Sequence, residues 1–331
     1  MDYVLHIGML LVGFVFLIKG ADYFIVSSSS IARKFNVSPL IIGLTLVAFG
    51  TSLPELAVSF TASITAKMNG TTADIAMGNV IGSNVANLTL ILGFSALMIP
   101  IVAKKSMFKR EFPFLIVITV VIALLSLIFQ SDYRIVWWEA LILLLFFGYY
   151  MYMMISHKNE VQIAEEIHIV DVKKAIILLV IGITGVSFGG FMVTTGAEFI
   201  AVELLVTAFS MSLTKATTLV GLSVVALGTS LPELVTSVMA AKKGENEIAL
   251  GNVVGSNVFN TVFIVGLSGL VTPLRMNQDV IIDTWIVLGI TVVMVIFAFT
   301  KGSISKKEGF ILVLIYVLYI TYIILRALGI M

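Results

Sequence analysis

The residues Gly50–Leu56 read GTSLPEL, and the same seven residues return at Gly228–Leu234, 178 positions later. A second pair of similar segments follows them, because Gly78–Asn87 reads GNVIGSNVAN and Gly251–Asn260 reads GNVVGSNVFN. Two matched pairs in the same order indicate that the chain consists of two related halves.

The composition places these repeats in a membrane protein. Hydrophobic residues make up 59% of the 331 residues, and charged residues only 12%, about half the share that is usual in soluble domains. About ten stretches have the roughly 20 apolar residues that a helix needs to cross the hydrocarbon. They lie near residues 3–30, 38–65, 72–100, 112–130, 135–156, 174–206, 216–240, 246–270, 279–300 and 309–329. The sequence therefore predicts an all-α polytopic membrane protein, embedded in a lipid bilayer, with about ten transmembrane helices.

The composition also excludes several classes of function. The chain has no cysteine, and its three histidines do not cluster, which argues against thiol chemistry and against a zinc or iron centre. A net charge of +1 does not indicate a nucleic-acid partner. The sequence has no H-E-x-x-H motif and no evident nucleophile–base pair. We therefore expect a protein that is not an enzyme and has no cofactor, and no feature indicates an obligatory protein partner.

Two halves of about five spans each follow from the repeats. We assign residues 1–156 to a first five-helix repeat, 157–172 to a cytoplasmic connector and 173–331 to a second five-helix repeat. Because each half has an odd number of spans, the second half inserts upside down relative to the first. This inverted-repeat plan is typical of secondary transporters, whose substrate site lies at the middle of the membrane between the repeats.

Basic residues predict the orientation, because loops on the cytoplasmic side carry an excess of lysine and arginine. With ten spans, five such residues fall on one side of the membrane: Lys67, Arg134, Lys215, Arg275 and Arg326. Fourteen fall on the other side: Arg33, Lys34, Lys104, Lys105, Lys109, Arg110, Lys158, Lys173, Lys174, Lys242, Lys243, Lys301, Lys306 and Lys307. We therefore expect a multi-pass plasma-membrane protein with both termini outside.

Glu55 and Glu233 each lie near the middle of a hydrophobic span. An ionisable side chain at this depth costs a few kcal/mol and normally faces a cavity, pairs with a partner or binds an ion. No lysine or arginine lies near the middle of a span to neutralise either glutamate. The remaining partners are a proton or a metal cation.

The residues around Glu55 favour a metal cation. Thr51 and Ser52 precede it by four and three residues, so the three side chains share one helix face. Pro54 lacks an N–H, and we expect it to free main-chain carbonyls around Ala48–Gly50. Carboxylate, hydroxyl and carbonyl oxygens are the ligands that hard cations prefer. The second half repeats the set as Thr229, Ser230, Pro232, Glu233 and the carbonyls around Ala226–Gly228.

The second motif supplies neutral oxygen atoms. Asn79, Ser83 and Asn87 recur every four residues and therefore line one face of a helix. Asn84 lies off that face, and we expect it to form hydrogen bonds between helices. The corresponding residues of the second half are Asn252, Ser256, Asn260 and, off the face, Asn257. Glycines that allow close helix contact lie at Gly78, Gly82, Gly251 and Gly255.

Each of these features has a structural explanation when it occurs once. A proline kink with serines is often only structural, and a mid-span glutamate can be a protonated hydrogen-bond donor between helices. Two copies of the whole set favour a binding site. Asp22 and Glu198 occur in the similar triplets Gly20-Ala21-Asp22 and Gly196-Ala197-Glu198. We place them near the cytoplasmic and outer portions of two long helices, and we assign Ser27–Ser30 to helix packing or a span end.

These motifs resemble the paired repeats of the cation/calcium exchanger superfamily. Within it, the chain is most similar to the prokaryotic sodium/calcium exchangers, and the resemblance covers nearly the whole sequence. It is most specific where GTSLPEL and GN-V-x-GSN each occur twice. The resemblance implies an antiporter that exchanges cytoplasmic Ca²⁺ for external Na⁺ across the plasma membrane by alternating access. It also implies that spans one and six form a sliding pair.

The resemblance implies the ion ligands as well. Ca²⁺ would bind Glu55, Glu233, Thr51 and Thr229. Na⁺ would bind the same glutamates with Ser52, Ser83, Ser230, Ser256 and the carbonyls of Ala48 and Ala226, and Asn87 and Asn260 would complete the centre. A proton/Ca²⁺ antiporter of the same superfamily is the alternative. A channel is a further alternative, and it would require a continuous pore.

Replacement of Asn260 by aspartate tests whether this residue belongs to the ion centre. Some relatives carry an aspartate at this position, whereas this chain has amides at both Asn87 and Asn260. We expect Asn260→Asp to add a titratable charge and to make transport more dependent on pH than in the parent protein. Transport measured across a pH series checks this. An unchanged pH profile would place Asn260 outside the centre.

Overall fold

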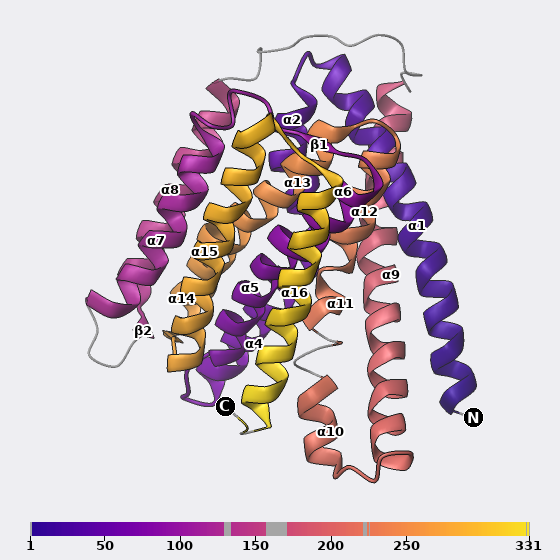
Figure 1. The fold of residues 1–331 in the computed structure, drawn as a ribbon, viewed down its shortest axis with the longest axis vertical. Helices are drawn as coiled ribbons and strands as arrows, with labels where there is room; N and C mark the ends of the chain where they lie inside the picture. The colour runs from indigo at the N-terminus through magenta and orange to yellow at the C-terminus, as the bar shows by residue number, and fades with distance from the viewer. Residues whose placement is uncertain are drawn as a thin grey trace.

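The computed structural model describes residues 2–128, 134–156, 171–220, 224, 226–328 and 330. These residues form a bundle of long helices (Figure 1). Most of the predicted connector, residues 157–170, lies outside the described residues.

The described part of the first half contains ten helical segments and two short strands. They are α1 (Asp2–Lys34), α2 (Pro39–Ile42), η1 (Gly43–Val47), α3 (Ala48–Thr51), α4 (Leu53–Met68), α5 (Asp74–Ala86), η2 (Asn87–Ile91), α6 (Leu92–Met98), β1 (Ile101–Val102), α7 (Glu111–Ile128), β2 (Arg134–Ile135) and α8 (Trp137–Ser156). The segments η1 and η2 are π-helical.

The second half follows a similar order of elements. They are α9 (Val172–Thr207), α10 (Leu213–Val220), α11 (Ala226–Thr229), α12 (Leu231–Lys242), α13 (Asn246–Val258), the π-helical η4 (Phe259–Ile264), α14 (Val265–Val271), β3 (Leu274–Arg275), α15 (Gln278–Lys301), β4 (Ser303–Ile304) and α16 (Lys306–Ala327). The strands pair between the halves, because β1 lies antiparallel to β4 and β2 lies antiparallel to β3.

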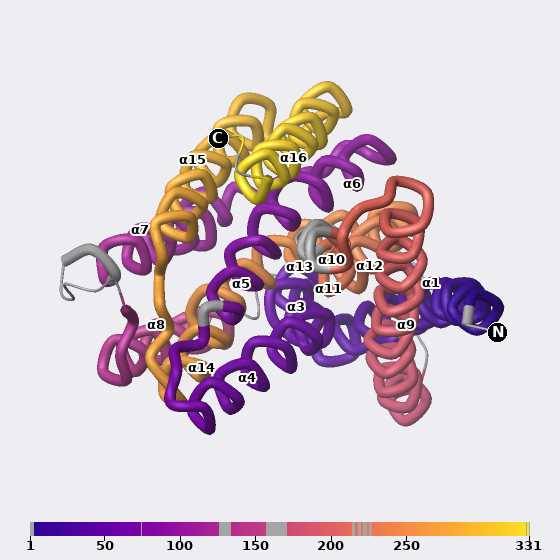
Figure 2. Tube along the Cα trace, turned by 90° about the horizontal axis from the view of Figure 1, so that it is seen from below, coloured from indigo at the N-terminus to yellow at the C-terminus, as the bar shows by residue number. Residues whose placement is uncertain are grey.

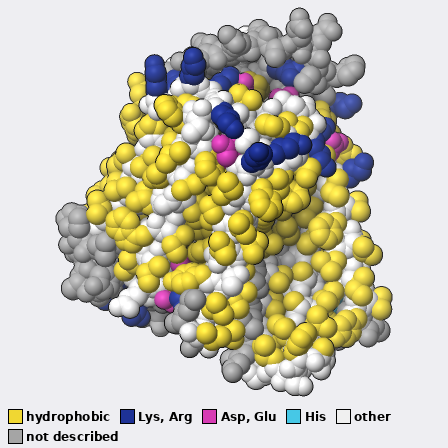
Figure 3. Space-filling model, in the orientation of Figure 1, with side chains coloured by type: hydrophobic (Ala, Val, Ile, Leu, Met, Phe, Trp, Pro, Cys, Tyr) yellow, Lys and Arg dark blue, Asp and Glu magenta, His cyan; other side chains and the backbone are white. Residues whose placement is uncertain are grey.

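The helices confirm the predicted class of helical polytopic membrane protein. Among the described residues, seven helices are long and apolar enough to cross a membrane, and the bent pair formed by residues 39–51 and α4 gives an eighth. The seventh predicted span, residues 216–240, corresponds to α10, α11 and α12, but residues 221–223 and 225 lie outside the description. Hydrophobic side chains cover the broad middle of the surface, and lysine and arginine side chains gather near one end (Figure 3).

Corresponding segments of the two halves run in opposite directions. In Figure 1 the chain descends from α2 to α4, whereas it ascends from α10 through α11 to α12. Viewed from below, α3, α5, α11 and α13 lie near the centre, and the pair α1 and α9 lies at one side (Figure 2). The central helices therefore come from both halves.

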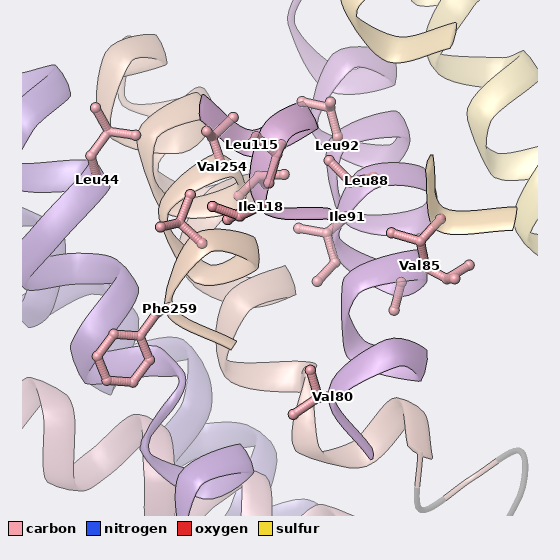
Figure 4. Close-up of a cluster of buried hydrophobic side chains, with 14 of the residues drawn as sticks. Leu44, Val80, Val85, Leu88, Ile91, Leu92, Leu115, Ile118, Val254 and Phe259 are labelled. Carbon is pink, nitrogen blue, oxygen red and sulfur yellow. The ribbon is translucent and has the colours of Figure 1, made fainter. Parts of the chain in front are cut away.

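The core is continuous between these central helices. Side chains of the first half, such as Leu44 and Leu88, and of the second half, such as Val254 and Phe259, meet in one buried cluster (Figure 4). The backbones also approach closely, since a Cβ atom built on Gly255 would lie 2.5 Å from the Leu44 carbonyl oxygen. Gly251 makes a similar approach to α2 and η1, as expected from the sequence. A Cβ atom on Gly78 or Gly82 would meet no described atom within 4 Å, so the prediction holds for one pair of glycines.

The long helices α1 and α9 pack against each other through glycines. A Cβ atom on Gly20 would lie 2.7 Å from the amide nitrogen of Val186, and one on Gly189 would lie 2.6 Å from that of Leu17. Such short approaches to backbone atoms allow only glycine at these positions. Helices that lack hydrophobic driving force in lipid associate through close van der Waals contact of this kind. We infer that α1 and α9 behave as one packed unit.

Replacement of one glycine in this seam should loosen the pair. We expect Gly189→Ala to lower the melting temperature, because the added methyl meets backbone atoms of α1 and overpacking typically costs about 1–3 kcal/mol. Gly8→Ala on α1 is the matched control, since its Cβ would meet nothing within 4 Å. Because alanine has a higher helix propensity than glycine, Gly8→Ala should leave the melting temperature equal or raise it. Equal thermal melting of both variants in detergent would contradict tight α1–α9 packing.

Candidate ion-binding site

Each of the two glutamates lies just after a break in a helix. α3 ends at Thr51 and α4 begins at Leu53, with Ser52 between them at φ −83° and ψ 9°. α11 ends at Thr229 and α12 begins at Leu231, with Ser230 at φ −89° and ψ 5°. The first break bends the chain by 49°. A proline occupies the second position of each following helix, where its missing N–H has no intrahelical partner to lose.

This arrangement puts Glu55 and Glu233 in the first turns of α4 and α12. The N-terminus of a helix carries a partial positive charge and unpaired N–H groups, which stabilise a nearby carboxylate by about 0.3–1 kcal/mol, and up to about 2 kcal/mol when partly buried. Both side chains are fully buried. The helix ends therefore offset part of the cost of burying two negative groups, and the sequence analysis did not anticipate this contribution.

Serines connect the two carboxylates across the halves. Ser52 of the first half donates to Oε1 of Glu233 at 2.9 Å. Ser230 of the second half donates to Oε1 of Glu55 at 3.1 Å. Ser83 also donates to Oε1 of Glu55 at 3.4 Å. Because each glutamate accepts a bond from the serine that precedes the other, the structure brings the two carboxylates into one enclosure.

Several buried oxygen atoms in this region have no hydrogen bond within the described part of the chain. They are Oε2 of Glu55, Oε2 of Glu233, Oγ of Ser256, Oδ1 of Asn87 and Oδ1 of Asn260. A buried polar atom without a partner is costly, and a buried charge without one is much more so. These atoms are carboxylate, hydroxyl and amide oxygens, which suit hard cations such as Na⁺ or Ca²⁺.

Asn79 and Asn252 hold the turns that carry the glutamates. The amide nitrogen of Asn79 donates to the main-chain carbonyl of Glu55 at 3.2 Å and to Ser59 at 2.9 Å. The corresponding bonds of Asn252 go to the carbonyl of Glu233 at 3.5 Å and to Ser237 at 2.9 Å. The sequence analysis missed the two serines. The signal was present, because both copies of the motif continue as LPEL-x-x-S.

The neighbours of Glu55 show one difference from the expectation. We expected Pro54 to free the carbonyls around Ala48–Gly50, but the Ala48 carbonyl accepts the N–H of Ser52 at 3.0 Å. The proline removes only its own N–H, so the preceding turn stays closed at Ala48. The Thr51 hydroxyl also lies 3.4 Å from the Ala48 carbonyl oxygen, so a cation would share this oxygen with two donors. In the second half the N–H of Ser230 donates to the Leu227 carbonyl at 3.1 Å, and Ala226 begins α11.

The two predicted threonine ligands, Thr51 and Thr229, are the last residues of the helices that precede the two breaks. Thr51 is fully buried and donates to Oδ1 of Asn252 at 3.0 Å. Thr229 is 9% exposed and occupies the last position of α11. The hydroxyl of Thr51 therefore ties the first half to the second, and its oxygen keeps lone pairs for a cation.

The asparagines of the second motif take different roles. Asn84 donates to Thr261 at 2.8 Å and accepts from Asn260 at 3.2 Å, so the predicted bonds between helices are confirmed. The prediction was wrong for Asn257, which donates to the Val253 carbonyl of its own helix at 2.7 Å. Asn87 begins η2 and Asn260 lies in η4. Such π-helical segments inside α-helices occur frequently at functional sites.

The fold and this enclosure define a polytopic helical membrane protein with two carboxylates buried among hydroxyl and amide groups. The family model described as "Sodium/calcium exchanger protein" matches the chain twice, over residues 5–156 and 174–325. The chain belongs to the sodium/calcium exchanger family.

Curated relatives and solved structures agree with this family. The chain is 35% identical over 323 residues to the "Putative antiporter CaxA" of Alkalimonas amylolytica. The match covers 93% of this chain and 95% of that protein. It is 35% identical over 347 residues to the "Sodium/calcium exchanger MaX1" of Methanosarcina acetivorans, with 94% and 96% covered. The solved structure of the sodium-calcium exchanger NCX_Mj soaked with 10 mM Na⁺ and 10 mM Sr²⁺ matches with a TM-score of 0.80 and 30% identity, and the match covers 96% and 98% of the two chains. These relatives are exchangers and antiporters, which are transporters and not catalytic enzymes.

Neutralisation of either glutamate should abolish Ca²⁺ binding. We expect Glu55→Gln and Glu233→Gln to reduce Ca²⁺ binding more than a hundredfold, because removal of one partner of a buried charge pair costs on the order of 3–5 kcal/mol. Titration calorimetry with the purified variants measures this. Glu139→Gln is the control, since Glu139 is also fully buried with one oxygen atom that has no hydrogen bond to described residues, but it lies at the start of α8 and not on either broken helix. Parent-like binding in either site variant would refute the assignment.

Proposed function

We propose that the protein is a secondary antiporter that exchanges Ca²⁺ for Na⁺ across the plasma membrane by alternating access. One observation carries the proposal: two fully buried glutamates from different halves share one enclosure, and each has an oxygen atom without a hydrogen bond. The names of the relatives and the match to NCX_Mj support it.

The proposal includes ten spans in two inverted five-helix repeats, 1–156 and 173–331, joined by a cytoplasmic connector. The double match of one family model, over residues 5–156 and 174–325, supports the division. The opposite directions of α4 and α12 support the inversion. The excess of basic residues in alternate loops supports a cytoplasmic position for the end where α1 finishes, and hence termini on the outside.

We assign the ligands by ion. Ca²⁺ would bind between Glu55 and Glu233 with Thr51 and Thr229. Na⁺ would use the same glutamates with the remaining oxygen donors of the enclosure: Ser52, Ser83, Ser230, Ser256, the carbonyls of Ala48 and Ala226, and the amides of Asn87 and Asn260. The unpartnered oxygens of Ser256, Asn87 and Asn260 support their inclusion.

The charge of the site explains why exchange is coupled. Two carboxylates balance one Ca²⁺, whereas an unoccupied site leaves two like charges buried. The protein should therefore change sides readily only when Ca²⁺ or Na⁺ is bound, and this restriction suppresses leak. If more than two Na⁺ ions bind, each cycle moves net charge and responds to voltage by about 2.3 kcal/mol per charge per 100 mV.

The pair α1 and α9 is positioned to open the site. It packs directly on the two broken helices, because a Cβ atom on Gly50 would lie 2.7 Å from the ring of Phe24. A Cβ atom on Gly228 would likewise meet Thr194 of α9, and one on Gly190 would lie 3.1 Å from Pro232. A shift of the pair therefore moves groups that touch both GTSLPEL motifs. This contact supports the sliding role that the family resemblance implies.

A proton/Ca²⁺ antiporter is the alternative, because two adjacent buried carboxylates can also exchange Ca²⁺ for protons. Sodium-dependent uptake of radioactive Ca²⁺ into proteoliposomes at fixed pH separates the two. We expect uptake that requires a Na⁺ gradient and that disappears in Glu233→Gln but not in Glu139→Gln. Uptake that ignores Na⁺ and follows a pH gradient would favour the proton-coupled alternative. Electrical conductance with ions on one side only would indicate a channel.

A further inference from the structure

We infer that an ion-pair latch, which joins the two halves at the end of the molecule where α1 finishes, holds the site closed at that end. The latch consists of Asp22, Ser29 and Arg33 on α1 with Lys243 and Glu245 of the α12–α13 turn. The inference rests on the proposed alternating access, and it adds the groups that set the balance between the two facing states.

Two ion pairs connect α1 to a single turn of the second half. Lys243 lies 2.6 Å from Asp22, and Arg33 lies 3.1 Å from Oε1 of Glu245. Ser29 donates to the same Glu245 oxygen at 2.5 Å. Asp22 and Arg33 are separated by about 16 Å along α1, from the rise of a helix. The turn therefore holds α1 along its last three turns.

The second pair is enclosed enough to be strong. The side chains of Arg33 and Glu245 are only 19% and 10% exposed. Removal of one partner from such a pair leaves the other charge without compensation, which costs much more than breaking an exposed pair. The turn also requires Gly244, which has φ +78°, a conformation that other residues adopt rarely.

The remaining contacts of α1 allow this latch to control its movement. Only 22% of the most apolar 18-residue stretch of α1 is buried. Near its N-terminus the ring of His6 stacks on Phe199 of α9 at 3.7 Å, and the glycine seam joins the same two helices. At this end α1 thus moves with α9, and at the other end polar bonds fix it to α12–α13. Such bonds depend steeply on distance and can be broken by a small shift.

The buried serine run supports a movable contact at the same place. Ser27–Ser30 are all buried, with at most 6% of any of them exposed, and they lie between Asp22 and Arg33. Ser28 has a buried hydroxyl without a hydrogen bond to described residues. We expected the run to be helix packing or a span end, and its burial agrees with packing. Small hydroxyl side chains pack without interlocking, so they do not oppose the withdrawal of α1.

The other half keeps an acidic residue, Glu198, at the position of Asp22, but it lacks the other charges of the latch. In the alignment of Gly20-Ala21-Asp22 with Gly196-Ala197-Glu198, the positions of Ser29 and Arg33 correspond to Leu205 and Phe209. The turn between α4 and α5, residues 69–73, reads NGTTA and has no charged side chain. Because the ion ligands are repeated and the latch is not, the two facing states differ in energy. The latch favours the state in which the Arg33 end is closed.

Thiol labelling tests the latch without using transport. The chain has no cysteine, so Ser28→Cys introduces one buried thiol behind the latch. In nanodiscs, we expect a maleimide to label Ser28→Cys slowly. Addition of Arg33→Gln or Glu245→Gln should raise the rate about tenfold, the effect of 1.4 kcal/mol on an equilibrium. The charge swap Arg33→Glu with Glu245→Arg should restore slow labelling, which shows that the variants are folded.

Lys104→Gln is the matched control. Lys104 lies 2.8 Å from Glu247, near the same end of the molecule, but this pair does not include α1. Lys104→Gln should leave the labelling rate unchanged.

Unchanged labelling in both Arg33→Gln and Glu245→Gln, or an equal rise in Lys104→Gln, would overturn the latch. If labelling responds as expected while sodium-dependent Ca²⁺ uptake is absent, the latch stands and the proposed exchange fails. If uptake is present and labelling does not respond, only the latch fails.

Discussion

The burial of two carboxylates in one enclosure is the constraint on which the rest of the structure depends. Glu55 and Glu233 are both inaccessible to solvent, and a serine from the opposite half donates to each. Like charges at short range in a protein interior repel by several kcal/mol, since unit charges 4 Å apart interact by about 4 kcal/mol at an effective dielectric constant of 20. Hydroxyl donors and helix N-termini reduce this energy but do not cancel it. A cation is the natural compensation.

The fold meets this constraint by breaking helices instead of inserting a loop. Each break lasts a single residue, Ser52 or Ser230, and places a new helix N-terminus inside the bundle. Backbone groups at this depth must be satisfied internally or line a polar cavity. The bonds from Asn79 and Asn252 to the Glu55 and Glu233 carbonyls satisfy part of that requirement. Because the serine bonds cross between halves, neither half can build the enclosure alone.

Much of the site could be predicted because identical residues occur in both halves at mid-span. A buried glutamate has few permissible partners, so Glu55 and Glu233 already indicated an ion site. The spacing of Thr51, Ser52 and Glu55 predicts one continuous helix face, whereas the helix breaks at Ser52. The state of the Ala48 carbonyl could not be read in this way, because it depends on whether the turn before the proline stays closed. The bonds of Asn257 and Asn84 depend on side-chain rotamers, which spacing along a helix does not determine. Spacing assigned both to the same role, and only Asn84 takes it.

The contacts of α1 could not be predicted either, because they join residues that are far apart in the sequence. The sequence identified Asp22 and the serine run, but the partners Lys243 and Glu245 lie in the other half, and no local pattern connects them. Under the proposed exchange, repetition lets both halves supply ligands to the same ions from opposite sides. Differences between the halves then show where the two sides are not equivalent. A protein with perfectly equivalent halves would have no preferred resting state, whereas a latch at one end of the molecule alone would give it one. In the proposed exchange, the apparent affinity of each facing state for its ion would fall as the fraction of molecules in that state falls. The latch between α1 and the α12–α13 turn would therefore influence affinity on both sides of the membrane without touching the ion.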